Sequence, residues 1–173
     1  MVQFYGTVEG ADAYHTDMGN SAWTGDNAAK SAALLRASVY IDGRYRKQPP
    51  SGRWESMFPG SKTAARGQER EWPRIGATDY DGNPIPDDEV PVEVEYATYE
   101  AAIRELSSPS SLSPDFVAVA AIKREKVGPI DTEYAVSADG GSAESVRPVI
   151  TVIDEIIAPV LVARYDLPGV MVV

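Results

Sequence analysis

Hydrophobic residues recur at three- and four-residue intervals in four stretches of the chain, a spacing typical of one face of an α-helix. Asp26 and Pro91 support the two long helices, because aspartate is a favoured N-cap and proline fits the first helical turn. Val92–Glu95 also alternates like a strand, but the spacing after it favours a helix. The predicted helices run from Thr7 to Met18, from Asp26 to Tyr45, from about Pro91 to Leu106, and from near Pro148 to Leu161.

Two β-favouring runs lie between the third and fourth predicted helices. Val117–Ile122 and Val127–Val136 are rich in β-branched and aromatic residues, and the second run alternates between apolar and polar positions. Lys123, Arg124 and Glu125 lie between the two runs. The pattern therefore predicts a β-hairpin over residues 116–136 with a charged tip.

Proline and glycine mark the connections. Gln48–Arg70 is rich in Pro, Gly, Ser and basic residues, which predicts a long loop. Asp79–Asn83 contains an Asp-Gly pair and predicts a tight turn. The predicted fold class is mainly α: a small helical bundle with an inserted β-hairpin, long loops and an extended C-terminal tail.

The length and charge limit the possible functions. A chain of 173 residues suits one domain, which we expect over residues 1–163, followed by a C-terminal arm over residues 164–173. A formal charge of −10 disfavours tight, unaided DNA binding, although acidity also serves solubility. No apolar run approaches the roughly 18 residues of a membrane span, so we predict no membrane partner and synthesis in the cytoplasm.

Residue types that carry enzyme chemistry are scarce. The chain has no cysteine, and its single histidine, His15, is expected near a helix end, where a partly exposed histidine needs no special role. Asp79, Asp81 and Asn83 resemble a calcium loop, but the required glutamate is out of register. No phosphate-binding or dinucleotide motif is found. We therefore predict no enzyme, no catalytic residue, no cofactor and no metal.

Three segments are predicted to contact partner chains, since each would gain most by being buried. They are the loop over residues 48–70, the tip of the hairpin and the apolar C-terminal arm. For the loop, packing of its apolar residues within their own domain is favoured over contact with a neighbouring chain. The candidate partner-binding residues are Trp54, Met57, Phe58, Lys123, Arg124, Lys126, Tyr165, Leu167, Val170, Met171 and Val172.

Several short motifs, in order, resemble a family of tailed-bacteriophage proteins that look like head–tail adaptors and are described as DnaT-like single-stranded-DNA-binding proteins. The resemblance covers Ala11 to Leu161, although the N-terminus is shorter and the loop over residues 48–70 longer than expected for the family. The motifs are Ala-Asp-Ala-Tyr-His from Ala11, Asn20-Ser21-Ala22-Trp23, Ala-Ala-Leu-Leu-Arg-Ala-Ser-Val-Tyr-Ile-Asp-Gly-Arg-Tyr from Ala32, Trp72-Pro73-Arg74-Ile75-Gly76, Ile85-Pro86, Lys126-Val127-Gly128-Pro129-Ile130 and Ile-Asp-Glu-Ile-Ile-Ala-Pro from Ile153.

The resemblance implies a structural adaptor subunit in the neck of the virion. Such a subunit would form a homo-oligomeric ring of twelve copies between the portal protein and the tail or tail-completion protein. An acidic channel through the ring would repel double-stranded DNA during its transient passage, which would give the charge of −10 a purpose.

The main alternative is a single-stranded-DNA-binding protein acting in phage replication. Trp23, Trp54 and Trp72 would then be stacking platforms, and arginines at positions 66, 70 and 74 would contact the backbone. The aromatic residues permit this hypothesis and the overall charge opposes it. An enzyme built on His15 is a third and weaker hypothesis.

Overall fold

The structure is a computed structural model that describes residues 3–47, 52–115, 124–127, 130–133 and 148–162. Within these ranges the chain forms four α-helices and three pairs of short antiparallel strands. The predicted mainly α class with an inserted hairpin agrees with this small mixed fold. The predicted C-terminal arm lies outside the described residues.

All four helices are found close to their predicted positions. Thr7 caps the first by accepting a hydrogen bond from the Gly10 N–H at 2.9 Å, and Asp26 caps the second by accepting one from the Ala29 N–H at 2.8 Å. Pro91 was predicted as the first residue of the third helix. It is instead the N-cap, so the helix begins one residue later than predicted. The helices are α1 (Val8–Asp17), α2 (Asn27–Arg44), α3 (Val92–Ser107) and α4 (Thr151–Ile157), which continues into the 3-10 turn η4 (Ala158–Val160).

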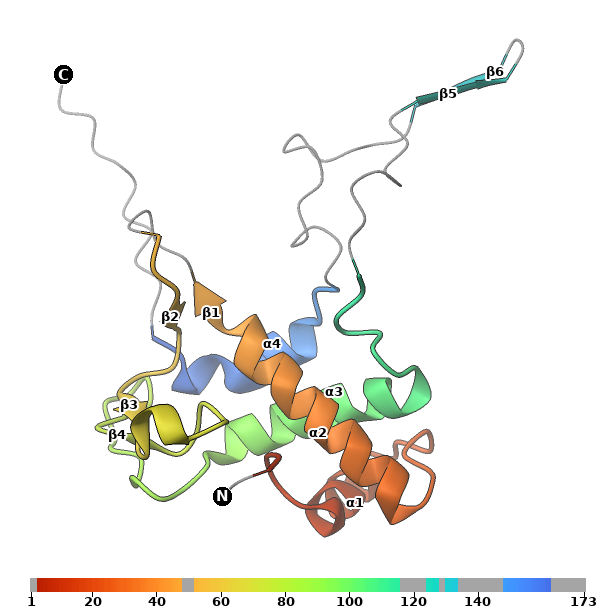
Figure 1. The fold of residues 1–173 in the computed structure, drawn as a ribbon. Helices are drawn as coiled ribbons and strands as arrows, with labels where there is room; N and C mark the ends of the chain where they lie inside the picture. Colours follow the sequence, from red (N-terminus) through yellow and green to blue (C-terminus); the bar gives the residue numbers. More distant parts are fainter. Residues whose placement is uncertain (1–2, 48–51, 116–123, 128–129, 134–147, 163–173) are drawn as a thin grey trace, which may run out of the picture.

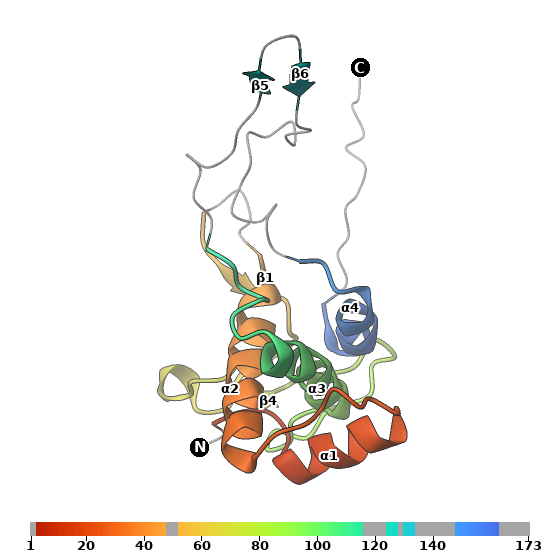
Figure 2. The ribbon, with the colours of Figure 1, turned by 90° about the vertical axis from the view of Figure 1, so that its right-hand side faces the viewer.

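Helix α3 is the centre of the fold. Helices α2 and α4 pack on different sides of α3. Helix α1 contacts both α2 and α3 on the side of the molecule away from α4 (Figures 1 and 2). Small side chains permit the close approach of α2 and α3, because Ala33 and Ala37 of α2 and Ala97 and Ala101 of α3 are fully buried. The core is therefore built around one buried helix rather than a symmetrical bundle.

The predicted long loop contains short strands of its own. β1 (Arg46–Lys47) pairs with β2 (Glu55–Ser56), and β3 (Ser61–Lys62) pairs with β4 (Arg74–Ile75). A 3-10 turn, η1 (Ala65–Gly67), lies between β3 and β4. The segment is thus folded back on itself against the end of α2 (Figure 1).

The inserted hairpin is present, but the predicted position of its tip is wrong. β5 (Arg124–Val127) pairs with β6 (Ile130–Glu133), and Arg124 lies opposite Glu133. Arg124 and Lys126 therefore lie within a strand, because the register pairs Val127 with Ile130. The first predicted strand, Val117–Ile122, lies outside the described residues.

No helix in the described part of the chain is long and apolar enough to cross a membrane.

Candidate functional site

Positive charge is concentrated in one segment of this acidic protein. Residues 44–74 contain eight of the 16 Lys and Arg residues but only three Asp and Glu, a net charge of +5. The rest of the chain carries eight Lys and Arg against 23 Asp and Glu, a net charge of −15. We call residues 44–74 the basic segment.

Backbone hydrogen bonds fix the first hairpin of the basic segment to the core. The Met57 N–H donates to the Tyr45 carbonyl at 2.9 Å, and the Val162 N–H donates to the Met57 carbonyl at 2.7 Å. The Tyr45 hydroxyl donates to Asp154 of α4 at 2.7 Å. Burial, together with this carboxylate, raises the pKa of Tyr45, so its hydroxyl stays protonated and remains a donor.

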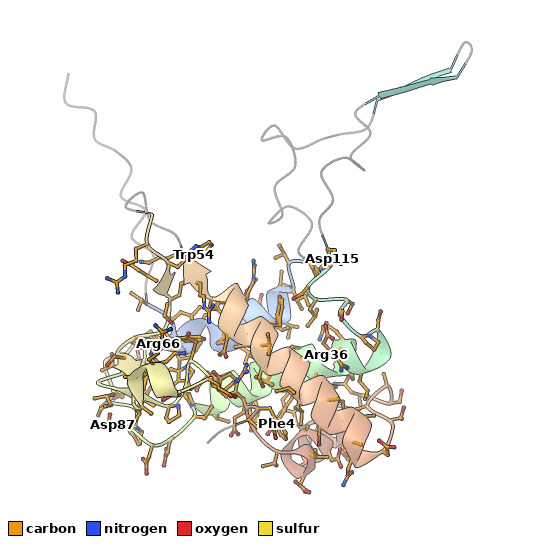
Figure 3. All side chains as sticks on the ribbon, viewed as in Figure 1. Phe4, Arg36, Trp54, Arg66, Asp87 and Asp115 are labelled. Atoms are coloured by element: carbon orange, nitrogen blue, oxygen red, sulfur yellow. The ribbon has the colours of Figure 1, made fainter. Side chains whose placement is uncertain are left out.

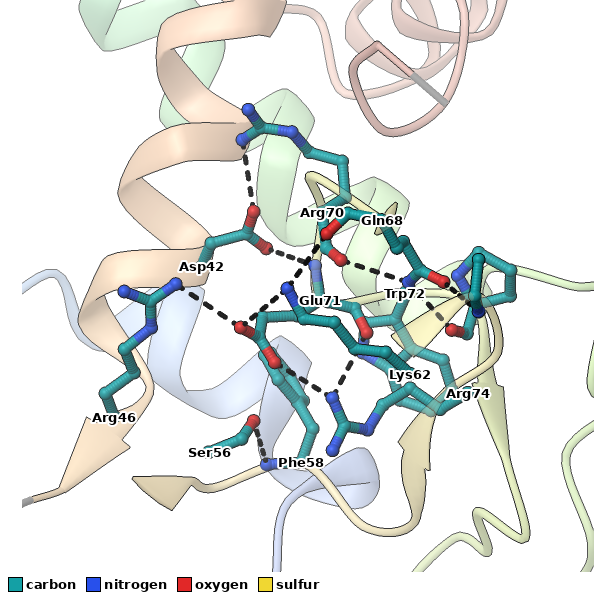
Figure 4. A network of polar contacts seen from close by, with 12 residues as sticks. Asp42, Arg46, Ser56, Phe58, Lys62, Gln68, Arg70, Glu71, Trp72 and Arg74 are labelled. Atoms are coloured by element: carbon teal, nitrogen blue, oxygen red, sulfur yellow. Dashed lines mark hydrogen bonds and ion pairs between the residues drawn. The ribbon is translucent and has the colours of Figure 1, made fainter. Parts of the chain in front are cut away.

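Asp42, near the end of α2, anchors the second half of the basic segment (Figure 4). Its carboxylate accepts hydrogen bonds from the Tyr5 hydroxyl at 2.5 Å, from Arg70 at 3.1 Å and from the Glu71 N–H at 3.2 Å. The Tyr5 hydroxyl in turn accepts from the backbone N–H groups of Glu71 and Trp72. Burial raises the pKa of Asp42, while the hydrogen bond from Tyr5 and the charge of Arg70 act in the opposite direction.

Glu71 gathers three cations from different parts of the segment (Figure 4). Its carboxylate lies 2.9 Å from Arg74, 3.3 Å from Arg46 and 3.4 Å from Lys62. Burial acts to raise the pKa of Glu71, but the charges of Lys62, Arg74 and Arg46 and a hydrogen bond from Ser56 lower it overall. Glu71 therefore stays ionised and links β1, β3 and β4.

Arg74 is a structural arginine. Only 4% of its surface is exposed, and beyond Glu71 its guanidinium donates to the carbonyls of Pro59 at 2.6 Å and Gly60 at 2.8 Å. Gly60 has a φ of +69°, and a Cβ there would lie 2.3 Å from the Ile75 carbonyl oxygen. This tight turn brings the two carbonyls together around the guanidinium.

Four cations of the basic segment are exposed to solvent: Arg46, Lys47, Arg53 and Arg66. Lys47 makes an exposed ion pair with Glu55 at 3.8 Å, and such pairs are weak. Arg46 pairs at 3.3 Å with the buried carboxylate of Glu71, but its own side chain is 44% exposed. Arg53 and Arg66 make no ion pair with any described residue. We call these four residues the exposed cations.

Trp54 lies among the exposed cations, next to Arg53 and directly before β2. It is 57% exposed, whereas a tryptophan side chain usually has most of its surface buried. Figure 3 shows Trp54 and Arg66 on the side of the molecule away from Arg36, with Asp87 on that side as well. The segment thus offers an exposed aromatic side chain and exposed cations.

The other two tryptophans cannot act as stacking platforms in this structure. Trp72 is 0% exposed and packs edge-on against Phe58, with ring centroids 5.8 Å apart. Trp23 is 7% exposed and donates its indole N–H to Asp12 at 2.6 Å. Arg70 is likewise committed, since it pairs with Asp42 with 12% of its side chain exposed. Of the six residues predicted for strand binding, Trp54 and Arg66 remain available.

The residues predicted to contact partners have different outcomes. Met57 and Phe58 are 6% and 2% exposed and belong to the core, so they pack within their own domain and are not free to contact a partner. Only the strand position of Arg124 and Lys126 is described, and they do not form the tip. The remaining predictions, Lys123, Tyr165, Leu167, Val170, Met171 and Val172, lie outside the described residues.

His15 is buried, not partly exposed as predicted. It is 1% exposed, its Nε2 lies 3.1 Å from the Tyr99 carbonyl oxygen, and its Nδ1 lies 3.1 Å from the Asn20 side-chain nitrogen. The two neighbours require a neutral ring with the proton on Nε2, because the carbonyl can only accept and the amide nitrogen can only donate. His15 thus joins α1 to α3. No cluster of three His, Asp or Glu residues suited to a metal ion is found in the described ranges.

We expect His15 to make the fold sensitive to acid. Burial lowers its pKa in the folded state, although Glu100, the Tyr99 carbonyl and Asp12 act in the opposite direction. The unfolded chain therefore binds a proton more readily, so the free energy of unfolding should fall as the pH drops below about 6.5. Denaturant titrations at several pH values should show this fall for the wild type and not for His15→Gln. An equal fall in both proteins would contradict the assignment.

A protein-family model matches residues 3–171, and the family is described as "Putative DnaT-like ssDNA binding protein". The chain belongs to this family. No curated protein and no solved structure matches it. The match covers nearly the whole of this chain, including the basic segment.

The family contradicts the predicted adaptor function. Its description names binding to single-stranded DNA and nothing in it indicates a structural protein of the virion. The adaptor hypothesis also used the charge of −10 for an acidic channel that repels DNA, whereas half of the cations are collected on one segment. The ring of twelve copies, the portal and tail partners, the passage of double-stranded DNA and the location in the neck followed only from that function.

Arg46, Lys47 and Arg53 were missed at the sequence level as residues for DNA contact. The net charge of −10, which is summed over the whole chain, concealed this local group of cations. The local excess of cations between positions 44 and 74 was the available signal.

Proposed function

We propose that this DnaT-like protein binds single-stranded DNA through its basic segment and has no enzymatic activity. The exposed cations contact the phosphate backbone, and Trp54 stacks on a base. The observation that carries the proposal is the exposure of Trp54, at 57%, among cations in a chain of this family. The site proposed from the sequence is thereby reduced to Trp54 and Arg66 and extended by Arg46, Lys47 and Arg53.

Stacking on Trp54 favours a single strand over a duplex. In a duplex the faces of the bases are covered by their neighbours, whereas an unpaired base can leave the stack at little cost. Stacking on an aromatic side chain tolerates any base, because every base has a π-face. The proposed binding is therefore selective for single strands and largely independent of sequence.

The charge of −10 does not prevent this mode of binding. Salt screens charges over about 8 Å at physiological ionic strength, so acidic residues on distant faces contribute little at the basic segment. A bound strand would meet the four exposed cations, whereas Arg44 and Arg70 are already paired with Asp154 and Asp42, which lie outside the segment. Moreover, Asp42 and Glu71 are largely buried and are neutralised by Arg70 and Arg74.

The salt dependence of binding tests the proposal. Four backbone contacts by the exposed cations should give a plot of log K against log salt with a slope of about −3 for a single strand. The measurement is a fluorescence-anisotropy titration of a labelled oligothymidine at several salt concentrations, with a duplex of equal length as the comparison. A slope near zero, or tighter binding of the duplex, would contradict it.

A further inference from the structure

One buried carboxylate in the basic segment holds two partly exposed cations together. The side chain of Glu71 is 8% exposed, and its two oxygens have different partners. Oε2 accepts from Arg74, which also donates to the Gly60 carbonyl and is itself buried. Oε1 lies 3.3 Å from Nη2 of Arg46 and 3.4 Å from Nζ of Lys62 (Figure 4). Glu71 is thus fixed through one oxygen and holds two further cations through the other.

These two cations are close enough for one phosphate to contact both. Arg46 belongs to β1 and Lys62 to β3, and their nitrogens can be no further apart than the sum of their distances to the shared oxygen. Two oxygens of one phosphate can bridge nitrogens at such a separation, since a charge-assisted hydrogen bond is about 2.8 Å long. Both side chains also reach solvent, with 44% of Arg46 and 25% of Lys62 exposed.

The charges of this network leave a surplus that an anion would balance. Three cations surround the single carboxylate of Glu71, so two positive charges are in excess. Asp42 does not balance this surplus, because it pairs with Arg70. Glu55 does not balance it either, because it pairs with Lys47. The spacing, exposure and charge of the pair therefore all suit a phosphate.

We propose that Arg46 and Lys62 clamp one phosphate of the bound strand and that Glu71 is the positioning residue of this clamp, an inference that rests on the proposed function. Glu71 does not contact DNA. It holds two cations that would otherwise repel each other, so less side-chain freedom is lost on binding. Lys62 shares the phosphate that Arg46 contacts, and the number of contacted phosphates stays at four.

The clamp lies in the same hairpin as the proposed stacking residue. Trp54 directly precedes β2, and Ser56 of β2 lies opposite Arg46 of β1. The clamped phosphate and the base stacked on Trp54 therefore belong to one short stretch of the strand.

Glu71→Gln separates positioning from simple electrostatics, because the two predict opposite signs. Removal of a negative charge beside the cations would by itself strengthen the binding of an anionic strand. Loss of the clamp should instead weaken binding of labelled oligothymidine by about fivefold, as measured by anisotropy at low salt. Glu55→Gln is the matched control, because it removes the exposed partner of Lys47 from the same segment. It should bind at least as tightly as the wild type.

A second comparison separates positioning from a general structural role. In the Arg46→Gln/Lys62→Gln background, Glu71→Gln should cause no further loss of DNA affinity, because no clamp remains to be positioned. A structural role would weaken binding by the same factor in both backgrounds. Denaturant titration of each variant establishes that it is folded under the conditions of the binding measurement.

Each outcome decides between the two proposals. Binding by Glu71→Gln as tight as that by Glu55→Gln, or an equal loss in both backgrounds, overturns the clamp and leaves the proposed function standing. Failure of the wild type to bind oligothymidine overturns the proposed function, and the inference with it.

The cycle between Arg46→Gln and Lys62→Gln replaces these comparisons if Glu71→Gln does not fold. A shared phosphate predicts that the double variant loses less affinity than the product of the two single losses. Losses that multiply would show two independent contacts and overturn the clamp.

Discussion

Trp54→Ala should weaken binding of single-stranded DNA by roughly 5- to 150-fold, which corresponds to about 1–3 kcal/mol for one stacked base. Trp54 is 57% exposed and belongs to no buried cluster, so its removal should leave the free energy of unfolding nearly unchanged. The measurement is an anisotropy titration of oligothymidine at one low salt concentration. Loss of affinity without loss of stability is the expected combination.

Tyr96→Ala is the control for that experiment. Tyr96 is a partly exposed aromatic residue, at 42%, on α3 and outside the basic segment. It packs against Tyr14, with ring centroids 4.9 Å apart, and so its removal tests the effect of losing an aromatic side chain elsewhere. Its affinity for DNA should equal that of the wild type. Equal affinities for Trp54→Ala and Tyr96→Ala would exclude Trp54 as a stacking platform.

Asp42→Ala should destabilise the fold by about 3–5 kcal/mol, because it leaves Arg70, whose side chain is only 12% exposed, without its partner. The Tyr5 hydroxyl and the Glu71 N–H lose the same acceptor. The measurement is the free energy of unfolding from denaturant titration at neutral pH. A shift of this size would be large for a small domain, whose total stability is typically 5–15 kcal/mol.

Asp26→Ala is the matched control for Asp42→Ala. Asp26 caps α2 from an exposed position and makes no buried ion pair, so its loss should cost about 1 kcal/mol. A destabilisation by Asp42→Ala no larger than that of Asp26→Ala would show that the buried network does not hold the basic segment in place.

The local elements of this fold could be predicted because their signals are local. Asp26 and the apolar spacing after it define α2, and Pro91 defines the start of α3 within one residue. The turn at Asp79 is also local: its carboxylate accepts from the N–H groups of Asp81 and Asn83. Capping and turn chemistry depend on residues two to four positions apart, which a single sequence displays.

The basic segment could not be predicted in the same way. Asp42 binds Tyr5, 37 positions earlier, and Arg70, 28 positions later, and neither partner can be identified from spacing along the chain. The sequence therefore could not tell Arg70 and Arg74, which are held in ion pairs, from the exposed Arg66. The same limit applies to the tryptophans, of which only Trp54 is exposed.

The most direct test of the account removes two of the exposed cations. Arg53→Gln/Arg66→Gln is compared with Ala22→Glu/Thr24→Glu, which changes the net charge by the same amount at exposed positions outside the basic segment. The measurement is the salt dependence of oligothymidine binding. The account predicts a slope smaller by about 1.4 for the arginine variant and an unchanged slope for the control. Equal slopes for all three proteins, or no binding of single-stranded DNA at low salt, would contradict it.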